Sequence, residues 1–308
     1  MDRKDFLKTL ATAGVATSMG VSARIPEAQA ESAENIPDMV AVLGGEPVAM
    51  FEKAIAAMGG MGQYVKKGQK VAIKPNIAWD RTPEMGANTN PELVAAVVKA
   101  CLDAGAAEVV VFDHSCDDMR KCYKTSGVEA AAVAAGARVL PSDEERYYRE
   151  VSIPQGKNLT SAKIHEAILD CDVWFNVPVL KVHMGAKLTS AMKNYLGIVW
   201  DRQYFHRNDL SQCIADACTF EKKPALNIVD AYRIMKSNGP RGKSKSDVVT
   251  AKGLFISSNI VAVDTAATKF LGQVQGMTVE DVNHLKFGEE LNLGSTDLGQ
   301  LKIERIKM

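Results

Sequence analysis

The sequence predicts an α/β fold in three layers, with a mainly parallel sheet covered by helices on both faces. Short runs rich in Val and Ile alternate with helical patterns from residue 39 to residue 306. Several of these runs are apolar throughout, which is typical of strands buried on both faces. Aromatic residues make up only 6% of the chain, and the abundant small apolar residues suit helices packed closely on a sheet.

In the first half of the chain, strands are expected at short apolar runs and helices where apolar residues recur every three or four positions. A proline in the first turn and a glycine after the end support the helix at 91–104. The expected strands are 39–43, 70–73, 108–112 and 138–140. The expected helices are 47–58, 91–104 and 128–135.

In the second half the alternation continues, interrupted by a long connection rich in Gly, Ser and Lys at 232–249. The expected strands are 173–179, 225–229, 253–257 and 301–306. The expected helices are 164–169, 187–197, 210–219, 263–270 and 279–290. We expect a single domain over residues 31–308, within which residues 180–250 are a candidate subdomain.

The first 30 residues have the features of an export signal. Residues 2–8 resemble the twin-arginine (Tat) motif, with Lys4 in place of the second arginine. An apolar run at 9–20 and the small-x-small site at 28–30 follow in the order of a cleavable signal peptide. We expect export to the periplasm or another extracytoplasmic space, with the Tat translocase as a partner. An amphipathic N-terminal helix or an uncleaved anchor is the alternative.

The chain as a whole is electrically neutral. Lys and Arg together number 37, as do Asp and Glu. No global field therefore draws the protein to nucleic acid or to a membrane surface. No segment after the signal reaches the length of a stable membrane span, so any basic site must be local.

The strongest local feature follows the apolar run 173–180. Lys181, His183, Lys187 and Lys193 fall within thirteen residues, and gathering such cations is costly unless an anion lies among them. We expect Lys181, His183 and Lys193 to be catalytic and Lys187 to bind the anion. His183 is the candidate general acid–base because the ordinary pKa of histidine lies near neutrality. A structural histidine is the alternative.

Polar residues also follow other predicted strands, and the carboxyl ends of parallel strands meet at one edge of a sheet. The sequence therefore predicts a cleft that binds an anion or a metal. Besides Lys187, the expected anion-binding residues are Lys74, Asn76, Asn194 and Asp230. Asp113 and His114 are candidate metal ligands, in a mixture of N and O donors that suits zinc, iron or manganese. Taken alone, Asn76 and Asp113 also fit a turn or a helix cap. Asp230 also fits an ion pair with Arg233, and Lys74 a side chain that extends to solvent.

The same residues resemble a known family. Pro178-x-x-Lys181-x-His183 and Leu188-Thr-x-x-x-Lys193-Asn194-x-x-Gly197 are similar to the core signature of the DUF362 family, a domain of unknown function. The resemblance extends over residues 39–272 and implies no settled activity. Some members carry a ferredoxin-like iron–sulfur module. This chain contains no Cys-x-x-Cys-x-x-Cys run, so nothing in its sequence supports a cluster of that kind.

Two functions fit these features. The first is an enzyme that binds a small anionic substrate or cofactor at the strand ends and uses proton transfer or redox chemistry. The second is a non-catalytic protein that carries a metal or cofactor for the maturation of an exported redox enzyme. A bound metal or organic cofactor fits both functions, and its identity stays open.

Overall fold

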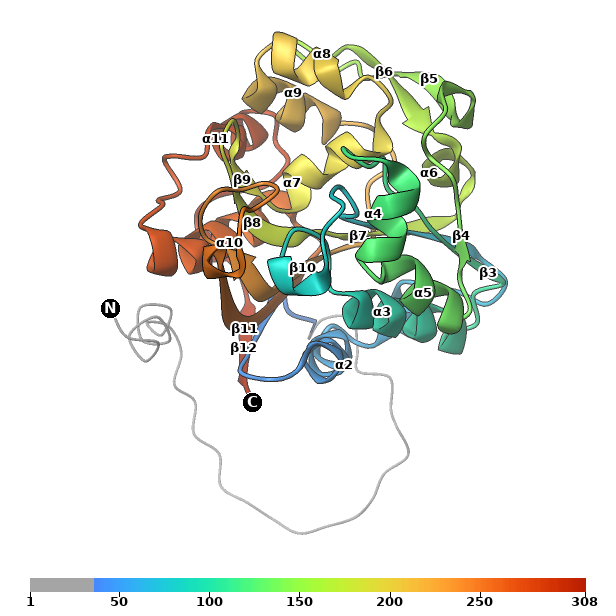
Figure 1. Ribbon diagram of the computed structural model, residues 1–308. Coiled ribbons are helices and arrows are strands. Elements are labelled where there is room, and N and C mark those ends of the chain that lie inside the picture. Colours follow the sequence, from blue (N-terminus) through green and yellow to red (C-terminus); the bar gives the residue numbers. More distant parts are fainter. Residues whose placement is uncertain (1–35) are drawn as a thin grey trace. The chain divides into compact units, whose positions relative to one another are not determined.

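A ten-stranded sheet runs through the middle of the protein, with the two-stranded sheet β5–β6 beside it (Figure 1). The computed structural model describes residues 36–308, which form one compact unit. The predicted export signal lies outside the described residues. The strands are β1 (Met39–Leu43), β2 (Lys70–Pro75), β3 (Glu108–Val111), β4 (Arg138–Val139), β5 (Tyr148–Ser152), β6 (Ser161–His165), β7 (Val173–Val177), β8 (Val179–His183), β9 (Lys187–Thr189), β10 (Leu226–Met235), β11 (Val248–Ser257) and β12 (Ile303–Lys307).

The strand order is β12-β1-β11-β10-β7-β2-β3-β4, and β8 pairs with β10 and β9. Within this sheet, β11 and β9 run antiparallel to their neighbours, while the other pairings are parallel. The expectation of a mainly parallel sheet is confirmed. Parallel neighbours require crossover connections, which the helices provide.

Helices cover both faces of the sheet, which confirms the three-layer expectation (Figure 1). They are α2 (Pro47–Ala57), α3 (Pro91–Asp103), α4 (Met119–Thr125), α5 (Val128–Ala134), α6 (Glu166–Asp170), α7 (Ala191–Asn194), α8 (Arg202–Arg207), α9 (Leu210–Ala217), α10 (Ile260–Gln275) and α11 (Asn283–Glu290). Helix α3 begins where the Asn90 side chain accepts a hydrogen bond from the Glu92 amide, with Pro91 in the first turn.

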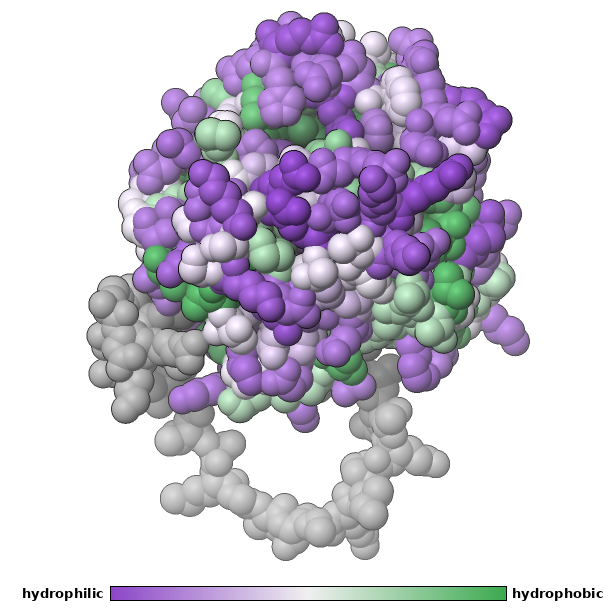
Figure 2. All heavy atoms as spheres, in the orientation of Figure 1, coloured by the Kyte–Doolittle hydropathy of each residue, from purple (hydrophilic) through white to green (hydrophobic). Residues whose placement is uncertain are grey.

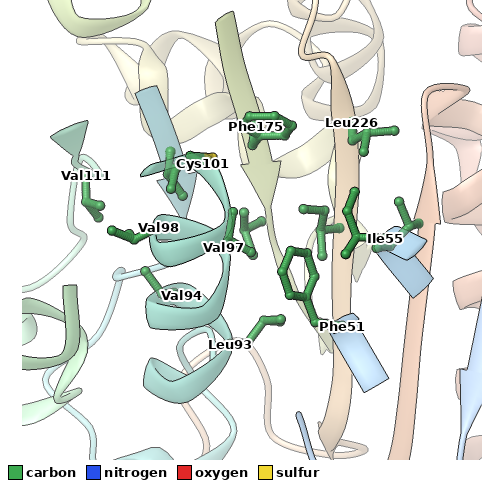
Figure 3. Close-up of a cluster of buried hydrophobic side chains, with 14 of the residues drawn as sticks. Phe51, Ile55, Leu93, Val94, Val97, Val98, Cys101, Val111, Phe175 and Leu226 are labelled. Carbon is green, nitrogen blue, oxygen red and sulfur yellow. The ribbon is translucent and has the colours of Figure 1, made fainter. Parts of the chain in front are cut away.

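The main apolar core lies between the sheet and the helices α2, α3 and α5. Val94 and Val98 of α3 and Phe51 of α2 point toward this core, which includes Phe175 of β7 (Figure 3). Burial of each such side chain contributes about 1.5–3 kcal/mol to the free energy of unfolding. This layer holds the strands in place and leaves the opposite face of the sheet for polar groups.

On that opposite face one lateral row of the sheet is polar. Lys74 of β2 stands opposite Asn176 of β7, which stands opposite Asn227 of β10, which in turn stands opposite Ser257 of β11. Side chains alternate along a strand, so these residues share one face while Ile73 points into the apolar core. Helices α7 and α10 pack over this face.

Several segments differ from the sequence predictions, and α4, β5 and α8 were not expected at all. The helix expected at 164–169 is the end of β6 followed by α6, because residues 161–165 pair with β5 in a hairpin. The helix expected at 187–197 is β9, the short α7 and a 3₁₀ turn at Tyr195–Ile198. Lys187 adopts a positive φ of 64° there, which turns the chain back along β8. The connection expected at 232–249 contains the end of β10 and the start of β11.

The visible surface in Figure 2 is mostly hydrophilic, with hydrophobic residues in small separate areas. Such scattered residues are normal on a globular protein. Within residues 36–308 we find no helix with both the length and the apolar character that a membrane crossing requires.

Candidate functional site

A cavity of about 950 Å³ lies beyond the carboxyl ends of β2, β3 and β8. Its lining includes the predicted residues Lys74, Asn76, Asp113, His114, Lys181, His183, Lys193 and Asn194. The fold therefore brings most of the predicted site together, from three strands and one helix. Arg202 of α8 also lines the cavity, although its sequence context gave no signal for this role.

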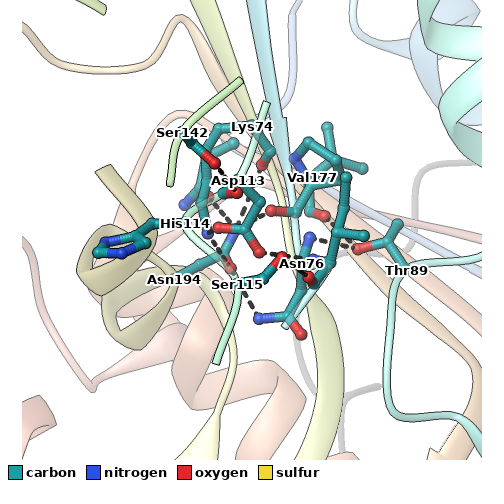
Figure 4. Close-up of polar contacts among 12 residues, drawn as sticks. Lys74, Asn76, Thr89, Asp113, His114, Ser115, Ser142, Val177 and Asn194 are labelled. Carbon is teal, nitrogen blue, oxygen red and sulfur yellow. Dashed lines mark hydrogen bonds and ion pairs between the residues drawn. The ribbon is translucent and has the colours of Figure 1, made fainter. Parts of the chain in front are cut away.

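At one side of the cavity, Lys74 and Asp113 form a buried ion pair (Figure 4). Lys74 Nζ lies 2.9 Å from Asp113 Oδ1, and each side chain is only 1% exposed. Asp113 Oδ2 accepts a hydrogen bond from the Ile77 amide at 2.5 Å. Burial lowers the pKa of Lys74, and the charge of Asp113 opposes that shift. Since each charge compensates the other, removal of either would leave a buried charge alone.

Gly197 allows the 3₁₀ turn after α7 to approach this ion pair. A Cβ atom at Gly197 would lie 1.9 Å from Asp113 Oδ1 and 2.3 Å from Lys74 Nζ. No side chain fits in that space, which gives a physical reason for a glycine at this position. The turn thus closes over the ion pair and forms part of the cavity wall.

The lateral polar row connects the ion pair to α7. Asn194 Oδ1 accepts a hydrogen bond from Lys74 Nζ at 2.6 Å, and Asn194 Nδ2 donates to Asn176 Oδ1 at 2.8 Å. Asn176 Nδ2 donates to Asn227 Oδ1 at 2.8 Å and to the Ala191 carbonyl at 2.9 Å. Asn176 and Asn227 were not predicted as part of the site, although an amide within an apolar strand is a signal that could have found them.

Asp264 of α10 fixes the amino end of α7. Its carboxylate accepts hydrogen bonds from the Ala191 amide at 2.7 Å and the Met192 amide at 2.8 Å. Burial raises the pKa of Asp264 to about 6. Together with the Asn176 contact, this cap holds the short helix that carries Lys193 and Asn194 in one position over the sheet.

Lys181 is a buried cation without an acidic partner among the described residues. Its side chain is 1% exposed, and Nζ donates to Asn76 Oδ1 at 3.0 Å and to the Ala87 carbonyl. An ammonium group has three donors, so one remains for a ligand. Burial, together with the nearby charge of Lys193, lowers the pKa of Lys181 to about 7.

Lys193 is partly buried at the cavity wall. Its amine makes no hydrogen bond or ion pair with any of residues 36–308. Burial, with the charges of Lys74 and Arg202, lowers the pKa of Lys193 to about 8. Arg202 itself donates to the carbonyls of His114 and Ser115 and to Cys116 Sγ, so its charge also lacks a carboxylate partner in this region.

His183 accepts two hydrogen bonds at Nδ1, from the amides of Gly185 at 3.1 Å and Ala186 at 3.0 Å. With Nδ1 as an acceptor, the proton of the neutral ring is assigned to Nε2. Burial and the charges of Lys193 and Lys181 lower the pKa of His183 far below its ordinary value. The geometry therefore favours a neutral imidazole that donates from Nε2 over the general acid–base that the sequence suggests.

Thr189 is a cavity residue that the predicted site did not include. Its side chain is 3% exposed, and its hydroxyl has no hydrogen-bond partner within the described chain. Thr189 stands directly opposite Lys181 in the β8–β9 pair, so these two side chains share one face of the hairpin. His183 lies two residues after Lys181 and belongs to that face as well.

Two predicted anion-binding residues lie elsewhere. Lys187 is exposed at the β8–β9 turn and is absent from the cavity lining. Asp230 accepts hydrogen bonds from the Asn90 amide at 2.7 Å and the Tyr232 amide at 3.0 Å, which places its carboxylate at the start of α3. The two hydrogen bonds of Asp230 are structural. Neither Lys187 nor Asp230 lines the cavity.

The predicted metal ligands are not brought into one ligand set. The Asp113 carboxylate forms the ion pair with Lys74. His114 Nδ1 lies 2.9 Å from the Val199 carbonyl, its ring stacks on Trp200, and the side chain points away from the ion pair (Figure 4). Over residues 36–308, no group of three or more His, Cys, Asp or Glu side chains is arranged to hold a metal ion.

Comparison with known proteins places this site in a family. The model of the domain of unknown function DUF362 matches residues 71–269, a range that contains the Lys74–Asp113 pair, the amide row and the lysines of the cavity. A thylakoid-associated protein of Synechocystis sp. is 25% identical over 236 residues, which are 74% of this chain and 70% of that protein. The chain therefore belongs to the DUF362 family, a domain of unknown function.

Proposed function

We propose that this protein is an enzyme that binds a small anionic substrate, such as a carboxylate, in the cavity beyond the strand ends. The observation that carries the proposal is the set of three cations, Lys181, Lys193 and Arg202, which line one cavity without a carboxylate partner among residues 36–308. A bound anion would provide the missing negative charge, and it would raise the lowered pKa values of both lysines.

The second part of the proposal is proton transfer within the cavity. Because the pKa values of Lys181 and Lys193 lie at about 7 and about 8, both charged and neutral amines are present near neutrality. A group poised in this way suits acid–base catalysis. The neutral His183 ring would donate a hydrogen bond from Nε2 to an oxygen that becomes negative in the reaction.

We further propose that the protein reaches an extracytoplasmic compartment through a Tat signal at residues 1–30. The proposal draws on the order of charged, apolar and cleavage-site residues. It is tested by cell fractionation of the full chain. Arg3→Gln in the motif is expected to hold the protein in the cytoplasm, while Arg24→Gln, outside the motif, is expected to leave export unchanged. Equal distribution of both variants and the wild type would contradict a Tat route.

Native mass spectrometry of protein purified anaerobically from its own cells tests the ligand. We expect a small anion at one copy per chain, retained in Lys187→Met and lost in Lys181→Met. Lys187→Met is the matched control because it removes the same charge outside the cavity. If the protein converts the identified anion to a product, the proposal that it is an enzyme is supported. Stable retention without turnover, together with capture of an exported redox protein, favours the carrier function instead.

A further inference from the structure

Lys193 differs from the other lysines of the cavity in the state of its amine. Lys74 is held by Asp113 and Asn194, and Lys181 donates to Asn76 and Ala87. Each of these two amines is already held by two acceptors of the protein, which fix its position and limit its approach to a substrate. The Lys193 amine has no partner of this kind within residues 36–308 and faces the cavity.

The backbone that carries Lys193 is held in place. Asp264 caps the start of α7, and Asn194, the next residue, bonds to Lys74 and to Asn176. The amine is therefore delivered to the cavity from a fixed position, as nucleophilic catalysis requires. The cationic surroundings and burial that lower its pKa increase its neutral, nucleophilic fraction.

The rest of the cavity supplies groups that would serve a carbonyl compound. Thr189 has a buried hydroxyl without a partner in the described region, and His183 is a neutral donor through Nε2. Both lie on the hairpin face of Lys181. Hydrogen bonds from Thr189 and His183 would polarise a carbonyl oxygen, while the remaining donor of Lys181 and the charge of Arg202 would hold an adjacent carboxylate.

We propose that Lys193 is a nucleophile that forms an imine with the carbonyl carbon of a short 2-oxo carboxylate. The amine nitrogen attacks the carbonyl carbon, and a proton passes from nitrogen to oxygen to give a carbinolamine. The carbon–oxygen bond then breaks, the oxygen takes up a further proton and leaves as water, and a protonated imine remains. No oxidant or reductant is consumed. This inference rests on the proposed anion site, since Lys181 and Arg202 of that site hold the carboxylate.

The test is reductive trapping on the full chain at neutral pH. The protein is incubated with pyruvate or glyoxylate and sodium cyanoborohydride, and the product is analysed by intact mass and by peptide mapping. The expected result is one adduct per chain, with the mass of the oxo acid less one oxygen atom, located on Lys193. Modification of Lys193 should exceed that of exposed lysines by at least about tenfold, because an ordinary lysine with a pKa of ~10.4 is almost fully protonated.

Lys193→Arg is the informative variant, because arginine keeps the positive charge but stays protonated. It should lose the adduct and still bind oxalate, which carries carboxylates but no ketone or aldehyde. Lys187→Met should keep the adduct. The wild-type peptide map alone locates the modified residue, so the test does not depend on the folding of any variant.

The outcomes separate the two proposals. Oxalate binding without an adduct, an adduct on Lys181, or equal modification of surface lysines would overturn the imine and leave the anion site standing. Absence of oxalate binding together with absence of an adduct would overturn both proposals. An adduct on Lys193 that oxalate suppresses would support both.

Discussion

The lateral polar row and the cavity beside it both bury polar groups, but only the row satisfies them. From Lys74 through Asn194 and Asn176 to Asn227, each amide or ammonium donor named here meets an acceptor within the protein. At the cavity, the Lys193 amine and the Thr189 hydroxyl meet none within residues 36–308. Burial of a polar group alone therefore does not indicate a ligand site. A buried donor that faces a cavity and lacks a protein partner does indicate one.

The difference assigns separate roles to lysines that look alike in the sequence. Lys74 belongs to a structural framework, the Lys74–Asp113 ion pair with the amides of Asn194, Asn176 and Asn227. Its charge is matched by Asp113 within the fold itself. Lys181 and Lys193 retain unmatched charge at the cavity. The framework residues should then control stability, and the unmatched lysines should control binding.

Removal of the Asp113 charge should have the greatest influence on the free energy of unfolding. Asp113→Asn leaves the Lys74 charge buried without its partner, and we expect a loss of about 3–5 kcal/mol in the free energy of unfolding, measured in urea. The matched control is Asp103→Asn in the exposed pair with Lys99, where the side chains are 62% and 71% exposed. That change should cost about 0.5 kcal/mol or less. Equal losses in the two variants would show that the buried pair has no special structural role.

A smaller effect concerns the cavity lysines and pH. The pKa of Lys181 is about 7 in the fold and near the ordinary value of 10.5 in the unfolded chain, so the unfolded chain binds more protons between these values. The free energy of unfolding should therefore rise as pH increases from about 7 to about 10. Lys181→Met should remove the part of the rise that starts near pH 7, which is about 3–4 kcal/mol between pH 7 and pH 10. The part due to Lys193, which starts near pH 8, should remain.

The control for that experiment is Lys187→Met, which should keep the full rise because Lys187 lies outside the cavity. Addition of oxalate should delay the rise to higher pH, since a bound anion favours the charged amines. If the free energy of unfolding of the wild type falls or stays level between about pH 7 and pH 10, the cavity lysines do not carry unmatched charge.

The smallest effect concerns the protonation state of His183. Nitrogen-15 NMR should show a neutral ring with its proton on Nε2 and no titration between about pH 5 and pH 8, the range in which an ordinary histidine changes charge. Burial and the charges of Lys193 and Lys181 keep the ring neutral by lowering its pKa. The amides of Gly185 and Ala186, which donate to Nδ1, place the proton on Nε2. A midpoint near 6.5 for this ring would instead restore His183 as the general base.

Much of the sheet could be predicted from local patterns. The apolar runs of β1, β2, β3 and β7, and the proline and glycine that bound α3, mark elements whose environment is uniform. The hairpin β5–β6 was missed because its polar, half-exposed strands carry no apolar run. The helix expected at 187–197 was too long, because the Lys187 turn places β9 at its start and the cap that begins α7 comes from Asp264, far away in the sequence.

The sequence predicted where the site lies but not what each of its residues does. Strand ends in a parallel sheet converge, so Lys74, Asn76 and Lys181 could be expected together. Asp230 follows the same rule but is drawn to the amides at the start of α3. The neutral state of His183 depends on burial and on the charges of Lys193 and Lys181. Its tautomer depends on two backbone amides whose positions follow from the β8–β9 turn, and no residue pattern encodes either.

Calorimetric titration with oxalate determines whether the unmatched lysines of this cavity, Lys181 and Lys193, bind a small anion. The wild type and Lys187→Met should bind oxalate with equal affinity. Lys193→Met should bind at least about tenfold more weakly, which corresponds to about 1.4 kcal/mol. Absence of oxalate binding by the wild type, or an equal loss of affinity in Lys187→Met and Lys193→Met, would contradict anion binding by these lysines.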